Sequence, residues 1–277
     1  ANVLINNLST NLNGNSLQCR GTIKDAMESQ LCDLSLDANL NLQELKSFLP
    51  ESLNVEMSGT ADCKFNIVAT LDDLSKTDLT KIKSNGIMNF SNLNAVYEDS
   101  TLIESQYLSI GYQVPSPNRN SNDAFSELIQ ATVKSPDLNI TLIDSANTIA
   151  KATSADLTLG LSNIMDTTIE PSMMLDFAFD RLSAQLDTVN AEVIMPKGIA
   201  KYYTPEDGSN ISLDLAYQSD GITALLGDNT SINTKFITIK ASALRDTTQE
   251  NPLLEWSPKV NVDFNEGVIQ TAELLYD

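Results

Sequence analysis

One stretch, residues 55–71, constrains the fold most, because apolar and polar side chains alternate along its whole length. Val68 alone interrupts the polar positions, and the other side carries Val55, Met57, Gly59, Ala61, Cys63, Phe65, Ile67, Ala69 and Leu71. A period of two predicts a β-strand with one buried face. At about 3.3 Å per residue this strand would span about 56 Å, whereas typical strands have about five or six residues. The main question is what so long an apolar face contacts.

A second alternating strand precedes this one and leads into a short helix. Leucine and alanine occupy the even positions from Leu34 to Leu42, with serine, aspartate and asparagine between them. The phrase LNLQELKSFLP then changes to helical spacing, and Pro50 ends it. The pattern predicts a strand at 34–42 and a capping helix at 42–49.

Most of the remaining chain alternates in the same way, with Gly, Asn, Asp and Pro between the alternating stretches. This is typical of antiparallel strands in a meander. We therefore expect a mainly β fold: an elongated, twisted antiparallel sheet, curled into a groove or an incompletely closed sandwich, with a few short helices. Residues 1–277 are expected to form a single elongated domain, with a subdivision conceivable at the proline-containing loop 114–130. Residues 33–50 and 211–227 both resemble a strand running into a helix, which suggests a repeated unit.

Composition excludes several classes of function. With 17 Lys+Arg, 37 Asp+Glu and a formal net charge of −20, the chain repels phosphate backbones, so no nucleic acid partner is expected. It has no histidine, which is the commonest general base and metal ligand. No enzymatic motif is recognisable, and we expect no enzyme activity, catalytic residue, metal site or cofactor. No apolar run reaches the roughly 20 residues of a transmembrane helix, and the sequence reads as a piece of a longer protein.

The three cysteines, Cys19, Cys32 and Cys63, form no CxxC pair. A zinc site is therefore not expected. The sequence favours buried free thiols, although a disulfide between Cys19 and Cys32 stays open as an alternative.

Two architectures fit the long apolar face. In a closed β-sandwich it would pack against a second sheet about 10 Å away. In an open, curled sheet it would line a groove for lipid acyl chains, which need no directional contact. The alternation fits both architectures and does not decide between them. The length of the strands, the aliphatic lining and the uncharged-polar or acidic opposite face suit the groove, but physical considerations alone still favour the sandwich.

Residues 31–112 contain a recognisable order of elements. A strand ends in the NLQELKSFLP helix, a long strand carries SGTADCKFNIVATLDDL, and VYEDS follows a G-x-M-x-F-x-x-L phrase formed by Gly86, Met88, Phe90 and Leu93. This order resembles the AsmA-like family of Gram-negative envelope proteins, which are related to bridge-like lipid transfer proteins. The charge of −20 and the high asparagine content depart from what the family leads one to expect.

The resemblance implies a periplasmic fragment of a protein that is tethered to the inner membrane in its full-length form. Its implied role is phospholipid transport between the inner and outer membranes, or outer-membrane maintenance and biogenesis. The implied partners are phospholipid or another acyl-chain lipid, together with other envelope proteins. The residues that would line the lipid groove are Leu34, Leu36, Leu40, Val55, Met57, Phe65, Ile67, Met88 and Phe90.

A different class of function remains as the alternative. The chain could be a surface or periplasmic β-sandwich module for binding or adhesion, with a glycan or protein partner. Such a module predicts aromatic rings clustered on an outer face or at loop tips, whereas a lipid groove predicts aliphatic residues along a concave surface.

Overall fold

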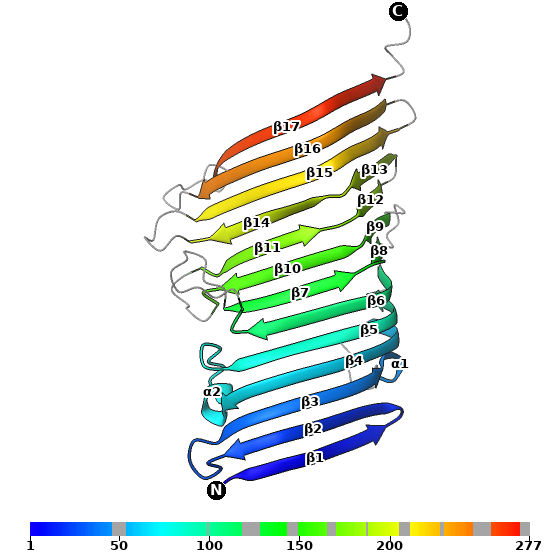
Figure 1. Ribbon diagram of the computed structural model, residues 1–277. Helices are drawn as coiled ribbons and strands as arrows, with labels where there is room; N and C mark the ends of the chain where they lie inside the picture. Colours follow the sequence, from blue (N-terminus) through cyan, green and yellow to red (C-terminus); the bar gives the residue numbers. More distant parts are fainter. Residues whose placement is uncertain are drawn as a thin grey trace, which may run out of the picture.

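The computed structural model describes residues 1–45, 54–98, 100–117, 128–142, 149–164, 170–186, 188–204, 211–227, 230–245 and 256–271. Two short helices accompany seventeen strands in these residues (Figure 1). The helices are α1 (Leu42–Leu45) and α2 (Leu71–Ser75). The strands are β1 (Val3–Leu12), β2 (Asn15–Lys24), β3 (Leu31–Asn41), β4 (Val55–Thr70), β5 (Lys83–Tyr97), β6 (Thr101–Val114), β7 (Ile129–Ser135), β8 (Asn139–Leu142), β9 (Ile149–Thr153), β10 (Ala155–Ser162), β11 (Ser172–Ala178), β12 (Arg181–Leu186), β13 (Val189–Ile194), β14 (Lys197–Tyr203), β15 (Ser212–Leu226), β16 (Thr230–Arg245) and β17 (Trp256–Thr271).

All strands belong to one antiparallel sheet with the connectivity of a simple meander. Four pairs of short strands run end to end, namely β7 with β8, β9 with β10, β11 with β12 and β13 with β14, so the sheet is thirteen rows wide. With about 4.8 Å between rows, it extends about 58 Å from β1 to β17. In the described part of the chain β1 pairs only with β2, and β17 only with β16, so the sheet stays open. The expected mainly β, twisted antiparallel fold is confirmed.

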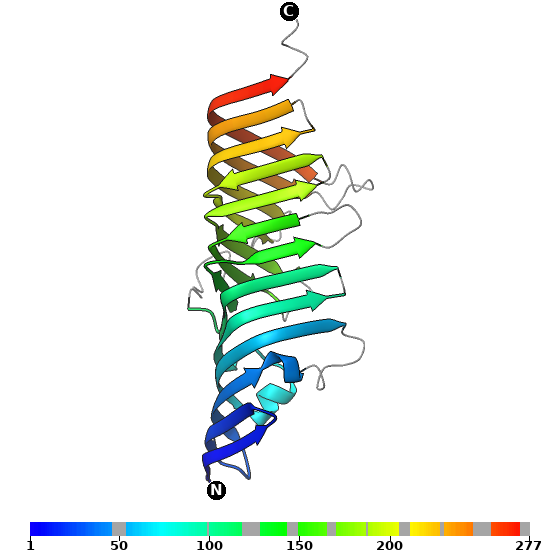
Figure 2. The same ribbon diagram turned by 90° about the vertical axis from the view of Figure 1, so that its right-hand side faces the viewer.

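A line of backbone irregularities crosses the sheet from β4 to β17, and we call it the crease. Along it, residues with positive φ interrupt the regular pairing of the strands: Gly59, Asn92, Ser154, Met195, Phe236 and Glu266. The register aligns them, because the pairing on either side of each irregularity continues from one row to the next. β-bulges bend a strand and increase its twist. Figure 2 shows the result: both halves of the sheet bend to the same side, which gives the molecule a concave and an outer face.

The irregularities of β5 and β16 also shift the alternation along these strands. On β5 the positions on the concave side continue from Phe90 to Leu93 rather than to position 92, and on β16 they continue from Thr234 to Ile237 rather than to position 236. We call the halves of the sheet on either side of the crease its two arms. Side chains of a strand otherwise alternate strictly between faces, so the extra residue keeps the apolar side chains on the concave side in both arms. The bulges therefore preserve one apolar face through the bend.

The crease makes a prediction about Asn92, whose φ is 51°. A β-branched residue is strained in this left-handed region, whereas glycine and asparagine are tolerated. We expect Asn92→Val to lower the free energy of unfolding by about 1–2 kcal/mol. Asn92→Gly should stay within about 0.5 kcal/mol of the parent protein, and chemical denaturation measures both. Equal stability of the two variants would contradict a left-handed residue at this position.

The sequence predictions are met unevenly. The strand expected at 55–71 is β4, although Leu71 begins α2, and the strand at 34–42 corresponds to β3. The helix expected at 42–49 begins as α1, and its positions beyond Leu45 lie outside the described residues. The same holds for most of the loop 114–130, although β7 already starts at Ile129 and pairs with β6.

The suggested strand-then-helix repeat is wrong for its second copy. Residues 212–226 form the single strand β15, with no helix. The apolar positions of β15 change from Leu213, Leu215 and Tyr217 to Ile222 and Ala224 because the crease interrupts their alternation. A shifted alternation of this kind imitates the uneven spacing of a helix.

Candidate functional site: the concave apolar face

One continuous row of ladder partners crosses one arm of the sheet, and all its side chains point to the concave face. Residues directly opposite each other in an antiparallel pair share a face. The row runs from β1 to β17 through Leu8, Cys19, Leu36, Phe65, Gly86, Tyr112, Ala131, Leu159, Leu175, Ala200, Leu215, Ala241 and Val260. No residue of this row carries a charge.

A second row crosses the other arm in the same way. It runs from β4 to β17 through Met57, Ala95, Ile103, Ile140, Ala150, Ala184, Ala191, Ala224, Ile232 and Ile269. Every member is aliphatic or methionine. These two rows, with the apolar residues between them, define the concave apolar face.

The concave apolar face is only partly covered by protein. Leu36, Phe65, Leu159 and Leu215 are half-buried. Towards β17 the exposure rises, to 64% for Val260 and 66% for Ile269. In a closed sandwich such positions would be buried against a second layer. The structure has no second sheet in its described residues, so the closed sandwich that physical considerations favoured does not form.

Many of the buried residues lie along the crease, which forms the floor of the concave face, and others, such as Val114, lie at the ends of the strands away from it. Small side chains dominate there: Ala61 is 1% exposed, Ala155 2%, Ser135 4% and Ser219 0%. Small residues suit this position because the two arms diverge from it and their first side chains crowd together. The floor is thus a narrow core, whereas the walls above it stay open.

At the floor, where the ladder is interrupted between β7 and β8, polar groups of β6 donate hydrogen bonds to Asp137. One carboxylate oxygen of Asp137 accepts a hydrogen bond from the Ser105 hydroxyl at 3.0 Å, and the other accepts the backbone N–H of Gln106 at 2.9 Å. Ser105 Oγ also lies 3.0 Å from Ser135 Oγ. Asp137 therefore replaces ladder hydrogen bonds that the crease removes.

Helix α1 covers the concave apolar face near the amino-terminal end, where Figure 2 shows it between the two arms. Leu42 of α1 is 3% exposed and packs in one cluster with Ala61, Cys63, Leu93 and Leu108. Leu45 packs against the same cluster. This cluster forms an apolar core on the concave side over β4–β6.

All nine residues predicted from the resemblance lie on the concave apolar face, and all are half-buried. Five of them pack against the cluster that contains Leu42: Leu40, Met57, Phe65, Met88 and Phe90. The other four, Leu34, Leu36, Val55 and Ile67, share the face but lie outside that cluster. Their role in holding lipid stays a prediction.

Gly86, one of the residues that carry the resemblance, has a packing reason. The rings of Phe65 and Tyr112, its two ladder partners, have centroids 6.2 Å apart and lie over the glycine. A Cβ atom at position 86 would collide with both rings. Glycine therefore lets two aromatic rings cover the backbone of β5.

The open walls between β10 and β17 were not singled out by sequence reasoning. They carry Met173, Leu213 and Leu226, which are 46%, 42% and 40% exposed, on the concave side. Their alternation is as regular as that of β4 on each side of the crease. A search that allowed one shift of phase per strand would have found them.

The three thiols are free: Cys19 is half-buried, and Cys32 and Cys63 are buried. The disulfide left open between Cys19 and Cys32 does not form. Burial raises the pKa of the Cys63 thiol, and the negative charge of the neighbouring Asp62 raises it further. Cys63 is thus a packing residue of the core rather than a reactive group.

No helix in the described part of the chain is both long and apolar enough to cross a membrane. Likewise, no group of three or more acidic or cysteine side chains among the described residues could hold a metal ion. The concave apolar face is the candidate site in the described residues. Comparison with known proteins gives no relative to guide the choice: no family model, no curated protein and no solved structure matches this chain.

Proposed function

We propose that the protein is a non-enzymatic carrier of acyl-chain lipids, which lie along the concave apolar face. The observation that carries this proposal is the pair of uncharged apolar rows that cross the sheet without a second layer to cover them. Exposed apolar surfaces much larger than a few hundred Å² mark sites of interaction. An occupant with long aliphatic chains matches a lining that is itself almost entirely aliphatic.

The dimensions of the arms suit a lipid. On β15 the wall between the crease and one rim comprises Ser212–Ser219, or about 25 Å of strand. Half of a bilayer's hydrocarbon core is about 15 Å thick. An acyl chain can therefore lie against one wall while its headgroup stays in water at the rim. Each methylene removed from water contributes about 0.8 kcal/mol without any directional contact.

The cellular role follows from the sequence resemblance and belongs to the proposal. The protein would act in the periplasm, tethered to the inner membrane in its full-length form. There it would move phospholipid between the two membranes or maintain the outer membrane. Lipids would slide along a surface about 58 Å long, nearly twice the roughly 30 Å hydrocarbon thickness of a bilayer.

The alternative, an adhesive module, has less support in the described residues. That alternative predicts aromatic rings gathered on an outer face or at loop tips. The ring pairs that pack together are Phe65 with Tyr112 and Phe177 with Phe179 and Tyr217, and Phe65, Tyr112, Phe177 and Tyr217 belong to the concave side. The aromatic residues thus add to the apolar lining.

Lipid extraction tests the proposal directly. The protein, purified without detergent from cells that make phospholipids, is expected to release phospholipid on solvent extraction, as measured by mass spectrometry. After delipidation it should take up fluorescent phospholipid from vesicles. Absence of both retained and acquired lipid would contradict the proposal. A stable dimer without lipid, detected by light scattering, would instead assign the concave apolar face to contact between two copies.

A further inference from the structure

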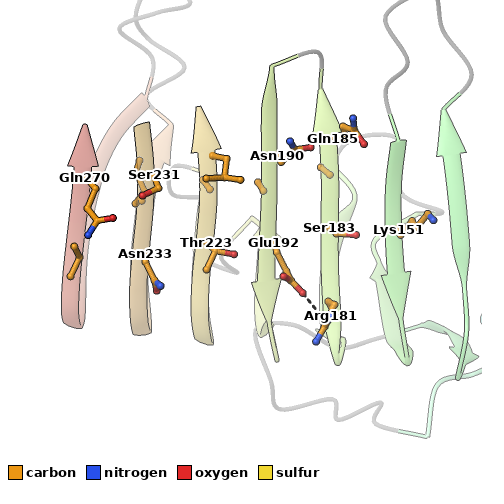
Figure 3. Close-up of a pocket in the computed structure, with 16 residues that line it drawn as sticks. Lys151, Arg181, Ser183, Gln185, Asn190, Glu192, Thr223, Ser231, Asn233 and Gln270 are labelled. Carbon is orange, nitrogen blue, oxygen red and sulfur yellow. Dashed lines mark ion pairs between the residues drawn. The ribbon is translucent and has the colours of Figure 1, made fainter. Parts of the chain in front are cut away.

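The outer face of the sheet holds a second candidate site. A hollow of about 860 Å³ extends over β9, β12, β13, β15, β16 and β17 (Figure 3). Its position on the outer face follows from the register: Ser183 is the ladder partner of Lys151 and Glu192, and Thr223 joins Glu192 to Asn233. Known ligand sites have volumes of about 300–1,000 Å³. The hollow therefore has the size of a ligand site and crosses six rows, or about 24 Å.

Four side-chain amides, beside the apolar side chains of Leu225 and Val268, are among the lining residues: Gln185, Asn190, Asn233 and Gln270. None of them hydrogen-bonds another group of the protein in the described part of the chain. Hydroxyl groups of Ser183, Thr223 and Ser231 lie among them. An amide presents donors and an acceptor side by side, which matches the neighbouring hydroxyl groups of a sugar.

This lack of internal pairing is not general on the outer face. Near the amino-terminal end the amides bind polar side chains of adjacent strands: Asn66 Nδ2 donates to Asn85 Oδ1 at 3.1 Å, and Asn39 Nδ2 donates to the Asp62 carboxylate at 2.6 Å. The Ser109 hydroxyl likewise donates to Asn89 at 2.8 Å. Amides on adjacent strands can thus satisfy each other in this sheet. Those of the hollow keep their hydrogen-bonding groups available to a ligand.

The charge of the hollow differs from that of the chain. Arg181 Nε donates to Glu192 Oε1 at 2.8 Å, and Lys151 has no carboxylate partner among the described residues. The lining thus has one more cation than anion, in a chain of net charge −20. Figure 3 places Lys151 and Arg181 at one end of the hollow and Gln270 at the other.

We propose that this hollow binds an acidic oligosaccharide that lies across the strands. Its hydroxyl groups would pair with the amides and hydroxyls, and a carboxylate would lie near Lys151 and Arg181. A peptide fits less well, because peptides on sheets usually pair with a free backbone edge or insert side chains into apolar pockets. The backbone of β13, β15 and β16 is already paired on both sides. No aromatic side chain lines the hollow, so the affinity is weak, with a Kd of about 0.1–1 mM.

This inference does not depend on lipid transport, because it concerns the opposite face. Its test uses the full chain and three probes in isothermal titration or NMR titration: hexagalacturonate as the acidic glycan, maltohexaose as the neutral one and hexaglutamate as the acidic peptide. Hexagalacturonate is expected to bind at least fivefold more tightly than either of the other two. The double variant Asn233→Ala with Gln270→Ala should weaken it at least fivefold. Lys151→Gln should remove most of the preference over maltohexaose.

A matched control is Gln113→Ala, which removes an exposed amide from the outer face of β6, far from the hollow. It should bind like the parent protein. Absence of saturable binding to hexagalacturonate would overturn the inference, as would equal binding by the double variant. Equal binding of hexaglutamate would show a site for acidic chains of any backbone and would also overturn it. Lipid retention should be the same in all these variants, which separates this result from the test of the proposed function.

Discussion

Leu215→Asp is expected to reduce the phospholipid retained by the protein at least tenfold while the protein remains folded. Leu215 lies on the concave apolar face between Ala200 and Ala241, and it is half-buried rather than sealed. Without lipid, an aspartate there remains in contact with water, so the cost to folding is small. With lipid bound, the carboxylate would be buried against an acyl chain without a partner, which costs several kcal/mol. A loss of 1.4 kcal/mol in binding is already tenfold.

The neighbouring residue supplies the control for this experiment. Ala216 lies on the same strand, but it is exposed on the outer face, so Ala216→Asp adds the same charge on the side without lipid. Circular dichroism should show the same β content in both variants, and lipid extraction should separate them. If Leu215→Asp retains as much lipid as Ala216→Asp, the lipid does not lie on this wall. If Leu215→Asp unfolds, position 215 belongs to a sealed core, and the carrier proposal fails for it.

Local sequence patterns predicted the faces of the strands, and a curled sheet was expected, but the patterns did not predict where the sheet bends. The alternation of β4 could be recognised because Gly59 does not shift it. The residues opposite its apolar side are apolar as well, as Leu36 opposite Phe65 and Ala95 opposite Met57 show. On β15, by contrast, the alternation changes phase between Tyr217 and Ile222. That change is a single extra residue, and only the alignment of such residues across neighbouring strands shows that they form one crease. The alignment is a property of the register, which depends on residues far apart in the sequence.

The candidate site was predicted in part for a related reason. The nine residues named from the sequence share the concave apolar face, because alternation fixes the face of each residue. Alternation does not say what else packs on that face. Leu42 belongs to a helical phrase that could be recognised, yet its contacts with Leu93 and Leu108 join segments separated by many residues. The packing of α1 onto β4–β6 therefore needed the structure, and it directs the experiments to the open walls of β10–β17.

Ala61→Asp is the second large expected effect, and it acts on folding rather than on lipid. Ala61 is 1% exposed at the floor of the concave face, in the cluster formed with Leu42, Cys63, Leu93 and Leu108. A carboxylate there is buried without a partner, which costs about 3–5 kcal/mol. For a chain of this size each kcal/mol corresponds to about 2–4 °C, so we expect the melting temperature to fall by about 10 °C or more.

The control for this variant is Thr60→Asp on the exposed outer side of the same strand, which should change the free energy of unfolding by no more than about 0.5 kcal/mol. Differential scanning calorimetry measures both variants. An introduced aspartate thus has different consequences at two positions of one face. At the floor, Ala61→Asp destabilises the fold, whereas at the wall, Leu215→Asp removes lipid. This difference follows from the burial of the floor at Ala61 and the partial exposure of the wall at Leu215. A stable Ala61→Asp protein would show that water reaches the floor, and α1 would then not seal the amino-terminal end of the concave apolar face.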